Sequence, residues 1–150
     1  MNPIGFYRNN SGTLSVQNIN INDLAKKYGT PLFIYDSGLM KERYNAFVEA
    51  TSHLNGNIHY AVKANDALSI ISYFAKLGCG ADIVSIGEFK KCVAAGVSPK
   101  KIIFSGVGKE NSEIEYALKN NVLQFNIESE EELDDIHKIA SRLKLYANIC

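Results

Sequence analysis

Ile58-His59-Tyr60-Ala61-Val62-Lys63-Ala64-Asn65 is the stretch that decides the fold, because it predicts a buried β-strand whose last inward-facing side chain is a lysine. β-Branched and aromatic residues favour a strand here. Alternation along a strand places Lys63 on the same face as Ala61 and opposite Tyr60. A lysine that is desolvated in such a position can lose its proton and form a Schiff base. The alternative is a strand-end lysine that extends its ammonium group to water.

The residues after this stretch repeat the same pattern. Each interval between apolar, strand-like runs holds an amphipathic helix, so the repeat predicts β-α units. Right-handed connections assemble such units into a parallel α/β sheet, and the even spacing favours a closed (β/α)8 barrel of the TIM type. The runs begin near Ile58, Ala81, Ile102, Leu123 and Lys144, at intervals of roughly 21 residues.

An eight-stranded barrel needs about 250 residues, whereas about five strands fit before Cys150. We therefore expect an incomplete barrel and a chain that is the first part of a longer protein. Two of the expected helices begin with a Ser-x-x-Glu capping box, at Ser85–Glu88 and Ser129–Glu132. Apolar faces at helical spacing include Ile70, Ile71, Phe74 and Leu77; Phe89, Cys92 and Val93; Ile114, Ala117 and Leu118; and Leu133, Ile136, Ile139 and Ala140.

Before the repeat, the pattern predicts a short β segment and two helices. Turn-forming residues between Phe6–Arg8 and Leu14–Val16 predict a hairpin. Asn20 or Asn22 can cap a short helix that Gly29 ends. The run Leu32–Tyr35 is too apolar to be exposed, and we expect it to be a buried strand. Ser37 is then expected to cap a helix from Leu39 to about Leu54.

Composition favours a globular protein that acts on a small molecule. The chain has 150 residues, of which 46% are hydrophobic and 21% charged. Sixteen basic and sixteen acidic residues cancel, so no overall field attracts nucleic acid or an anionic membrane. No signal peptide and no segment of transmembrane length is present in the sequence, and we expect a cytoplasmic protein.

Cysteine and histidine spacing predicts neither a disulfide framework nor a metal site. The three cysteines, an odd number without a Cys-x-x-Cys pair, are expected to be small core residues: Cys79, Cys92 and Cys150. The three histidines have no ligand spacing: His53, His59 and His137.

Two acidic residues are candidates for a site around Lys63. Asp82 lies at the start of the next strand, where it could pair with the lysine or attract a cationic substrate; its alternative is a strand-entry residue that binds backbone donors. Glu88 is ambiguous, because the capping box alone explains it. The loop Ser105–Glu110 is glycine-rich, but it lacks the first glycine and the Ser or Thr of a phosphate-binding loop. Whether it is functional or purely geometric stays open.

Five motifs in order carry a resemblance to a known family. The chain resembles the amino-terminal part of the diaminopimelate decarboxylases, members of the alanine-racemase-like group of pyridoxal-phosphate enzymes that includes ornithine and arginine decarboxylases. The resemblance covers about Phe6 to Leu145. Its motifs are Gly29–Asp36; Tyr60–Asn65; Gly78–Asp82 with Ser85–Glu88; Ile103–Gly106 with Lys109; and Phe125–Ser129 with Glu132-Leu133.

The resemblance implies roles for residues and segments. Lys63 matches the lysine that holds pyridoxal 5'-phosphate as a Schiff base, and Asp82 and Glu88 match acidic positions near the cofactor. Residues 1–36 would belong to a second, β domain, and residues 37–150 would form the first part of the cofactor-binding barrel. The family's phosphate site and substrate site would lie beyond residue 150. One departure is Asn148, which stands where the family usually has an arginine.

The resemblance also implies an activity. It predicts decarboxylation of meso-2,6-diaminopimelate to L-lysine, a step of lysine biosynthesis, by a homodimer in its full-length form. We expect the 150 residues alone to be inactive. An ornithine- or arginine-type decarboxylase, or a non-catalytic regulatory or cofactor-binding relative, are the alternatives.

Overall fold

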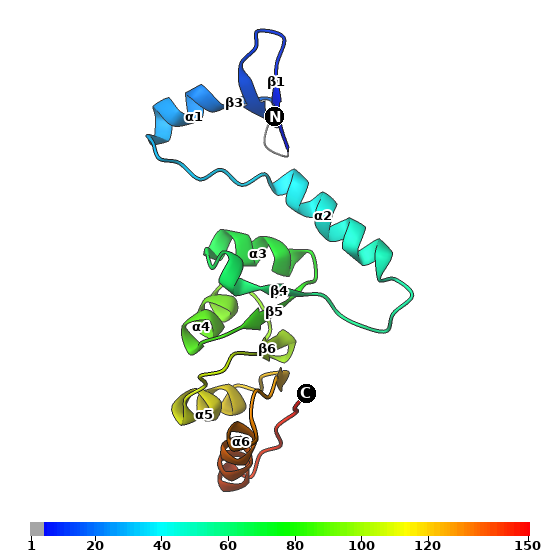
Figure 1. Cartoon of the computed structure of the whole chain (residues 1–150), viewed down its shortest axis with the longest axis vertical. Coiled ribbons are helices and arrows are strands. Elements are labelled where there is room, and N and C mark those ends of the chain that lie inside the picture. Colours follow the sequence, from blue (N-terminus) through cyan, green and yellow to red (C-terminus); the bar gives the residue numbers. More distant parts are fainter. Residues whose placement is uncertain (1–4) are drawn as a thin grey trace. The chain divides into compact units, whose positions relative to one another are not determined.

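Residues 5–150 are described by the computed structural model, and they fall into two units. The first unit ends at Asn55, and the second spans Gly56–Cys150. In Figure 1 the first unit runs from blue to cyan and the second from green to red. Within the described residues, no helix is both long enough and apolar enough to cross a bilayer.

A small antiparallel sheet opens the first unit. The predicted hairpin is confirmed, because the first two strands pair across a turn in which the Asn9 side chain accepts hydrogen bonds from the backbone of Ser11 and Thr13. A third strand extends the sheet in the order β1-β2-β3. The strands are β1 (Phe6–Arg8), β2 (Leu14–Val16) and β3 (Ile19–Asn20).

Helix α1 (Ile21–Tyr28) begins and ends as the sequence predicts. The Asn20 side chain accepts a hydrogen bond from the Asn22 backbone at 2.8 Å, and Gly29 follows the helix with a φ of 83°. Helix α2 (Ser37–Ala50) differs from the prediction at both ends. Its cap is Asp36, whose carboxylate accepts from the Leu39 backbone, so Ser37 is already helical.

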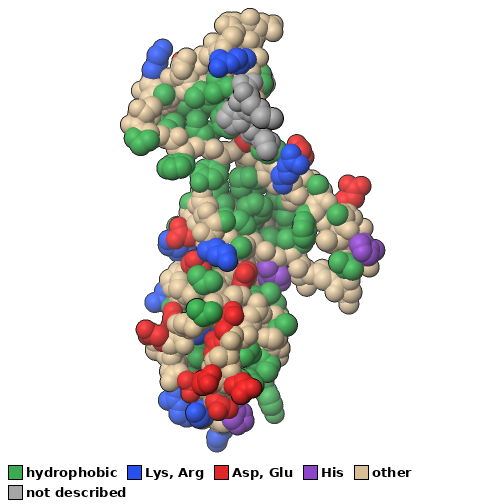
Figure 2. Space-filling view, in the orientation of Figure 1, with side chains coloured by type: hydrophobic (Ala, Val, Ile, Leu, Met, Phe, Trp, Pro, Cys, Tyr) green, Lys and Arg blue, Asp and Glu red, His purple; other side chains and the backbone are tan. Residues whose placement is uncertain are grey.

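The prediction that Leu32–Tyr35 forms a buried strand is wrong. The segment has no regular structure in the described chain, and the Phe33 side chain is 86% exposed. An apolar run becomes a strand only when a neighbouring backbone supplies hydrogen-bond partners, and the described first unit offers none to this segment. Figure 2 shows hydrophobic side chains at the surface of this unit.

The second unit contains a four-stranded parallel sheet in the order β4-β5-β6-β7. Ala61 pairs with Asp82, Asp82 with Ile103, and Ile103 with Gln124, so partners are separated by the interval of the sequence repeat. This is the partial (β/α)8 barrel that the repeat predicts. The strands are β4 (His59–Ala61), β5 (Gly80–Ile83), β6 (Ile102–Phe104) and β7 (Gln124–Phe125).

One face of this sheet packs against the helices, and Figure 1 shows each helix following its strand. The buried strand side chains on this face include Ile83, Phe104 and Phe125, and the rings of Phe104 and Phe125 stack with centroids 6.0 Å apart. Burying one such side chain stabilises the fold by about 1.5–3 kcal/mol. The helices are α3 (Leu68–Lys76), α4 (Ile86–Ala94), α5 (Asn111–Lys119) and α6 (Glu130–Leu143).

The predicted helix faces are largely confirmed, although Val93 and Leu133 are exposed at the edges of their apolar stripes. The serine half of each predicted capping box is also confirmed, because the Ser85 and Ser129 hydroxyls accept hydrogen bonds from the backbones of Glu88 and Glu132 at 3.2 Å. The glutamate half is wrong, because the two carboxylates accept from the backbones of Val84 and Glu128, one residue before each serine. Figure 2 shows acidic side chains gathered over α6, where negative charge in the first turn stabilises the helix dipole.

The fifth strand starts later than predicted. Helix α6 continues to Leu143, and Lys144 ends it in a left-handed conformation with a φ of 55°. The chain reaches β7 only at Ile149, which forms a single parallel bridge with Phe125. Backbone hydrogen bonds of 2.9 Å on both sides of this bridge continue the sheet in the predicted order.

Candidate functional site

The site begins where β4 ends. The strand stops at Ala61, and Val62–Ala64 form one turn of 3-10 helix. Two hydrogen bonds of 3.0 Å hold this turn, from the Asn65 backbone to the Val62 carbonyl and from the Tyr60 hydroxyl to the Asn65 carbonyl. Lys63 is therefore exposed, and the prediction of a buried, inward-facing strand lysine is wrong. It nevertheless lies directly beyond the carboxyl end of β4.

The Lys63 amine is free, unlike that of Lys109. Among residues 5–150, Lys63 takes part in no hydrogen bond or ion pair. The Lys109 side chain is only 1% exposed and donates to the Gly106 carbonyl at 2.8 Å, to the Asn126 carbonyl at 2.8 Å and to Glu132 at 2.5 Å. Lys109 is thus committed to the structure, and Lys63 is available for a ligand.

Asp82 lies on the neighbouring strand, in register with Ala61. Alternation puts its side chain on the sheet face opposite the helices, because the residues on either side, Ala81 and Ile83, are buried in the helix-side core. The Ser105 hydroxyl donates to one Asp82 carboxylate oxygen at 2.6 Å. The other oxygen has no partner within the part of the chain that the structure describes.

Two polar residues beside Asp82 were not predicted as site residues. The Asn126 side-chain amide donates to the Ser105 hydroxyl at 2.9 Å and accepts from the Gln124 amide at 3.0 Å. The sequence held one signal for these two residues. Ser105 and Asn126 are separated by the repeat interval, and each follows its strand directly.

Glu88 stands at the start of α4. Its carboxylate accepts a hydrogen bond from the Val84 backbone at 2.7 Å. Among the described residues, no hydrogen bond or ion pair joins it to Lys63 or Asp82, nor Lys63 to Asp82. The structure thus brings Lys63 and Asp82 to adjacent strand ends and leaves Glu88 in the first turn of α4, where its carboxylate binds the loop that precedes the helix.

Carboxylates also bind the backbone donors of the neighbouring loops. Glu113 accepts from the Ile86 backbone at 3.0 Å, and Glu128 accepts from the Gly106 backbone at 3.1 Å. A phosphate group would use backbone N–H donors of this kind, at a helix start or in the loop before one. The loop Ser105–Glu110 is therefore occupied by internal contacts, which favours its geometric role.

Two of the cysteines are core residues, as predicted, and the third is not. Cys79 and Cys92 are buried, whereas Cys150 is exposed. Burial, and then the nearby charge of Glu88, raises the pKa of the Cys92 thiol to about 12. Burial also raises the pKa of Cys79. Neither buried thiol is a reactive group at neutral pH.

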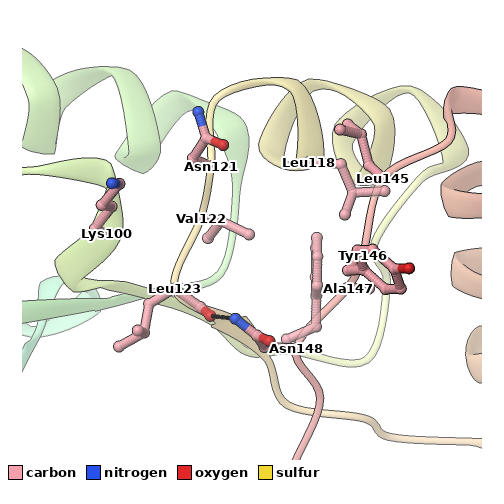
Figure 3. A pocket seen from close by; sticks show the side chains of 10 residues that line it. Lys100, Leu118, Asn121, Val122, Leu123, Leu145, Tyr146, Ala147 and Asn148 are labelled. Carbon is pink, nitrogen blue, oxygen red and sulfur yellow. Dashed lines mark hydrogen bonds between the residues drawn. The ribbon is translucent and has the colours of Figure 1, made fainter.

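A pocket of about 410 Å³ lies at the other end of the sheet. Lys100 and Asn121 line it just before β6 and β7 begin, and Asn148 closes one side by donating to the Leu123 carbonyl at 2.9 Å (Figure 3). Its lining shares no residue with the carboxyl-edge row of Lys63, Asp82, Ser105 and Asn126. We therefore place the candidate site at the carboxyl edge.

Comparison with protein families gives an independent result. Residues 37–149 match the family model described as the pyridoxal-binding domain of the pyridoxal-dependent decarboxylases. Lys63, Asp82 and Glu88 all lie inside the matched range.

Individual relatives agree with the family match. The diaminopimelate decarboxylase of Vibrio cholerae is 41% identical over 138 residues, which cover 92% of this chain and 33% of that protein. A solved structure from Aquifex aeolicus has a TM-score of 0.92 and 38% identity, over 97% of this chain and 36% of that one. Diaminopimelate decarboxylase from Helicobacter pylori, complexed with L-lysine, has a TM-score of 0.83 and 45% identity, over 87% and 33%. The chain thus spans about a third of the length of the relatives it matches.

Proposed function

Because the chain belongs to the pyridoxal-dependent decarboxylase family, we propose that it takes part in converting meso-2,6-diaminopimelate to L-lysine with loss of carbon dioxide. The relatives that match most of its length are named diaminopimelate decarboxylases. Since it spans about a third of their length, we propose that these residues work as the lysine-bearing part of a longer enzyme.

The observation that carries the proposal is the free amine of Lys63. It lies at the carboxyl edge of the parallel sheet, where side chains of several strands converge and where enzymes of barrel architecture place their active sites. It is exposed, and no described group competes for it. An amine in this state fits an aldehyde, which is the reactive group of pyridoxal 5'-phosphate.

Each candidate residue then has a proposed role. Lys63 would hold the cofactor through its amine and exchange protons with the bound substrate. Asp82 would attract a protonated amine through its unpartnered oxygen. Glu88 would keep the loop after β5 in place. When bound, pyridoxal phosphate supplies a ring that accepts the electrons left by the departing carboxylate.

The remaining features of the proposed enzyme follow from the same reasoning. We propose that residues 37–150 begin the cofactor-binding barrel and that residues 1–36 belong to a β domain. Four short strands and one bridge do not close a barrel, so the 150 residues alone are expected to lack activity. From the family resemblance we also propose a cytoplasmic homodimer that acts on an amino acid. The zero net charge fits the absence of a nucleic acid or membrane partner.

The test is to incubate the protein that contains these residues with pyridoxal phosphate and either meso-2,6-diaminopimelate, ornithine or arginine, and to measure carbon dioxide and amine products. We expect L-lysine from meso-2,6-diaminopimelate and no product from the Lys63→Ala variant. Faster release from ornithine or arginine would assign the activity to that type of decarboxylase. No release from any of the three would indicate a non-catalytic relative, and release by the 150 residues alone would refute the expected inactivity.

A further inference from the structure

A chain of hydrogen bonds crosses three strand ends and terminates at Asp82. The Gln124 side-chain amide donates to the Asn126 carbonyl oxygen at 3.0 Å, and the Asn126 amide donates to the Ser105 hydroxyl at 2.9 Å. The Ser105 hydroxyl in turn donates to Asp82 Oδ1 at 2.6 Å. All four residues are half-buried, so water competes with these bonds only in part.

The direction of this chain is fixed by its chemistry. An amide nitrogen can only donate, so the Ser105 oxygen accepts from Asn126 and keeps its own hydrogen for the carboxylate. Because a carboxylate oxygen only accepts, Ser105 must donate to Asp82, and the end of the Asn126 amide that faces Ser105 must be its nitrogen. Asp82 therefore receives a donor at Oδ1 while Oδ2 has no partner among residues 5–150.

We propose that Ser105 and Asn126 are positioning residues that hold the Asp82 carboxylate with Oδ2 open to a protonated amine bound beside Lys63. Asp82 is paired with Ala61, two residues before Lys63, and neighbouring strands lie about 4.8 Å apart. The cation that such an oxygen would take is the Lys63 nitrogen once it carries the cofactor and is protonated, or the ammonium group of an amino-acid substrate. The inference rests on the proposed function, because it needs a cofactor or substrate at Lys63.

If Ser105 only stabilised the fold, its loss would lower stability and would not act through Asp82. The core is held on the opposite face of the sheet by fully buried rings such as Phe104 and Phe125. Loss of one hydroxyl on the polar face should therefore leave the fold intact while it releases Asp82 to rotate. A residue that acts through Asp82 should also have no effect once the Asp82 charge has been removed.

The experiment measures how fast borohydride fixes pyridoxal phosphate on Lys63, by peptide mass spectrometry, in a double-mutant cycle. Ser105→Ala should slow labelling about tenfold, which corresponds to the loss of one hydrogen bond to a charged group. Ser105→Thr keeps the hydroxyl and should restore the rate. Asn126→Asp replaces the donor by an acceptor of the same shape, so it should slow labelling as Ser105→Ala does.

The double variant Ser105→Ala/Asp82→Asn should label no more slowly than Asp82→Asn alone. Ser141→Ala removes an exposed hydroxyl from α6 and should leave the rate unchanged, and urea unfolding confirms that each variant is folded. Labelling of Ser105→Ala and Asn126→Asp at the wild-type rate, or an effect that adds in full to that of Asp82→Asn, would overturn the inference. No label on the wild-type protein would instead overturn the proposed function and, with it, this inference.

Discussion

Replacing Lys109 by methionine removes the most deeply buried charge that the structure pairs. The Lys109 side chain is 1% exposed and that of its partner Glu132 is 11% exposed, with 2.5 Å between the charged atoms. Methionine fills most of the same volume but cannot donate. The Gly106 and Asn126 carbonyls then lose this donor, and the Glu132 carboxylate loses its cation and keeps the Glu128 backbone N–H.

The size of the effect follows from that loss. Removing one partner of a buried ion pair lowers the free energy of unfolding by about 3–5 kcal/mol, because the other charge stays buried without compensation. Glu132→Gln should lower it by a similar amount, about 3–5 kcal/mol, because it leaves the buried Lys109 charge unpaired and a single amide oxygen cannot accept from both Lys109 and the Glu128 backbone. In the double variant no unpaired charge remains, so its loss should be smaller than the sum of the two single losses.

Urea unfolding of the second unit, followed by circular dichroism, measures these changes. Lys138→Met is the matched control, because it breaks an exposed ion pair with Asp135 on α6 and should change the free energy by less than about 1 kcal/mol. If Lys109→Met were no less stable than Lys138→Met, the buried pair would not be holding the β6–α5 loop, and the reasoning would be refuted.

Three further predictions concern the same unit. At neutral pH a maleimide should modify the exposed Cys150 rapidly and Cys92 only after unfolding, because the pKa of Cys92 is about 12; equal rates in the folded protein would contradict this. The unfolded thiol ionises near its ordinary value of 9.0, so this group should lower stability as pH rises from 9 toward 12 and contribute no such loss below 9. Gly106→Ala should lower the free energy of unfolding by about 1–3 kcal/mol, because Gly106 has a φ of 101° and an added Cβ would lie 3.3 Å from Val84. Gly108→Ala meets open space and is the control; a Gly106 variant as stable as this one would show that the loop tolerates a side chain.

The order of elements could be predicted because it depends on local signals. A repeat interval near 21 residues fixed both the β-α order and the strand register, since one unit of strand, loop and helix has nearly constant length. The helix starts at Ser85 and Ser129 could also be predicted from the sequence, because a capping side chain binds a backbone N–H only three residues further along the chain.

The errors arose where one specific contact, or the lack of a pairing strand, decides the local structure. Strand β4 ends early because the Tyr60 hydroxyl binds the Asn65 carbonyl and stabilises a turn, and no periodicity reveals that contact. Leu32–Tyr35 has the composition of a strand, but composition cannot show whether a second backbone lies beside it.

The site was predicted only in part for the same reason. Lys63 and Asp82 could be predicted from the sequence, because each is a charged residue at a predicted strand position. Ser105 and Asn126 are common polar residues, and although the repeat interval separates them, the hydrogen bonds that connect them to Asp82 become visible only when the strands are paired.

The most direct test of the account is to treat the protein with pyridoxal phosphate and borohydride and to map the modified lysine. The Lys63 amine is free, whereas the Lys109 amine donates three hydrogen bonds, so the two lysines should react differently with the aldehyde. We expect the label on Lys63 and none on Lys109. A label on Lys109, or a folded protein with no label on Lys63, would contradict the claim that Lys63 holds the cofactor.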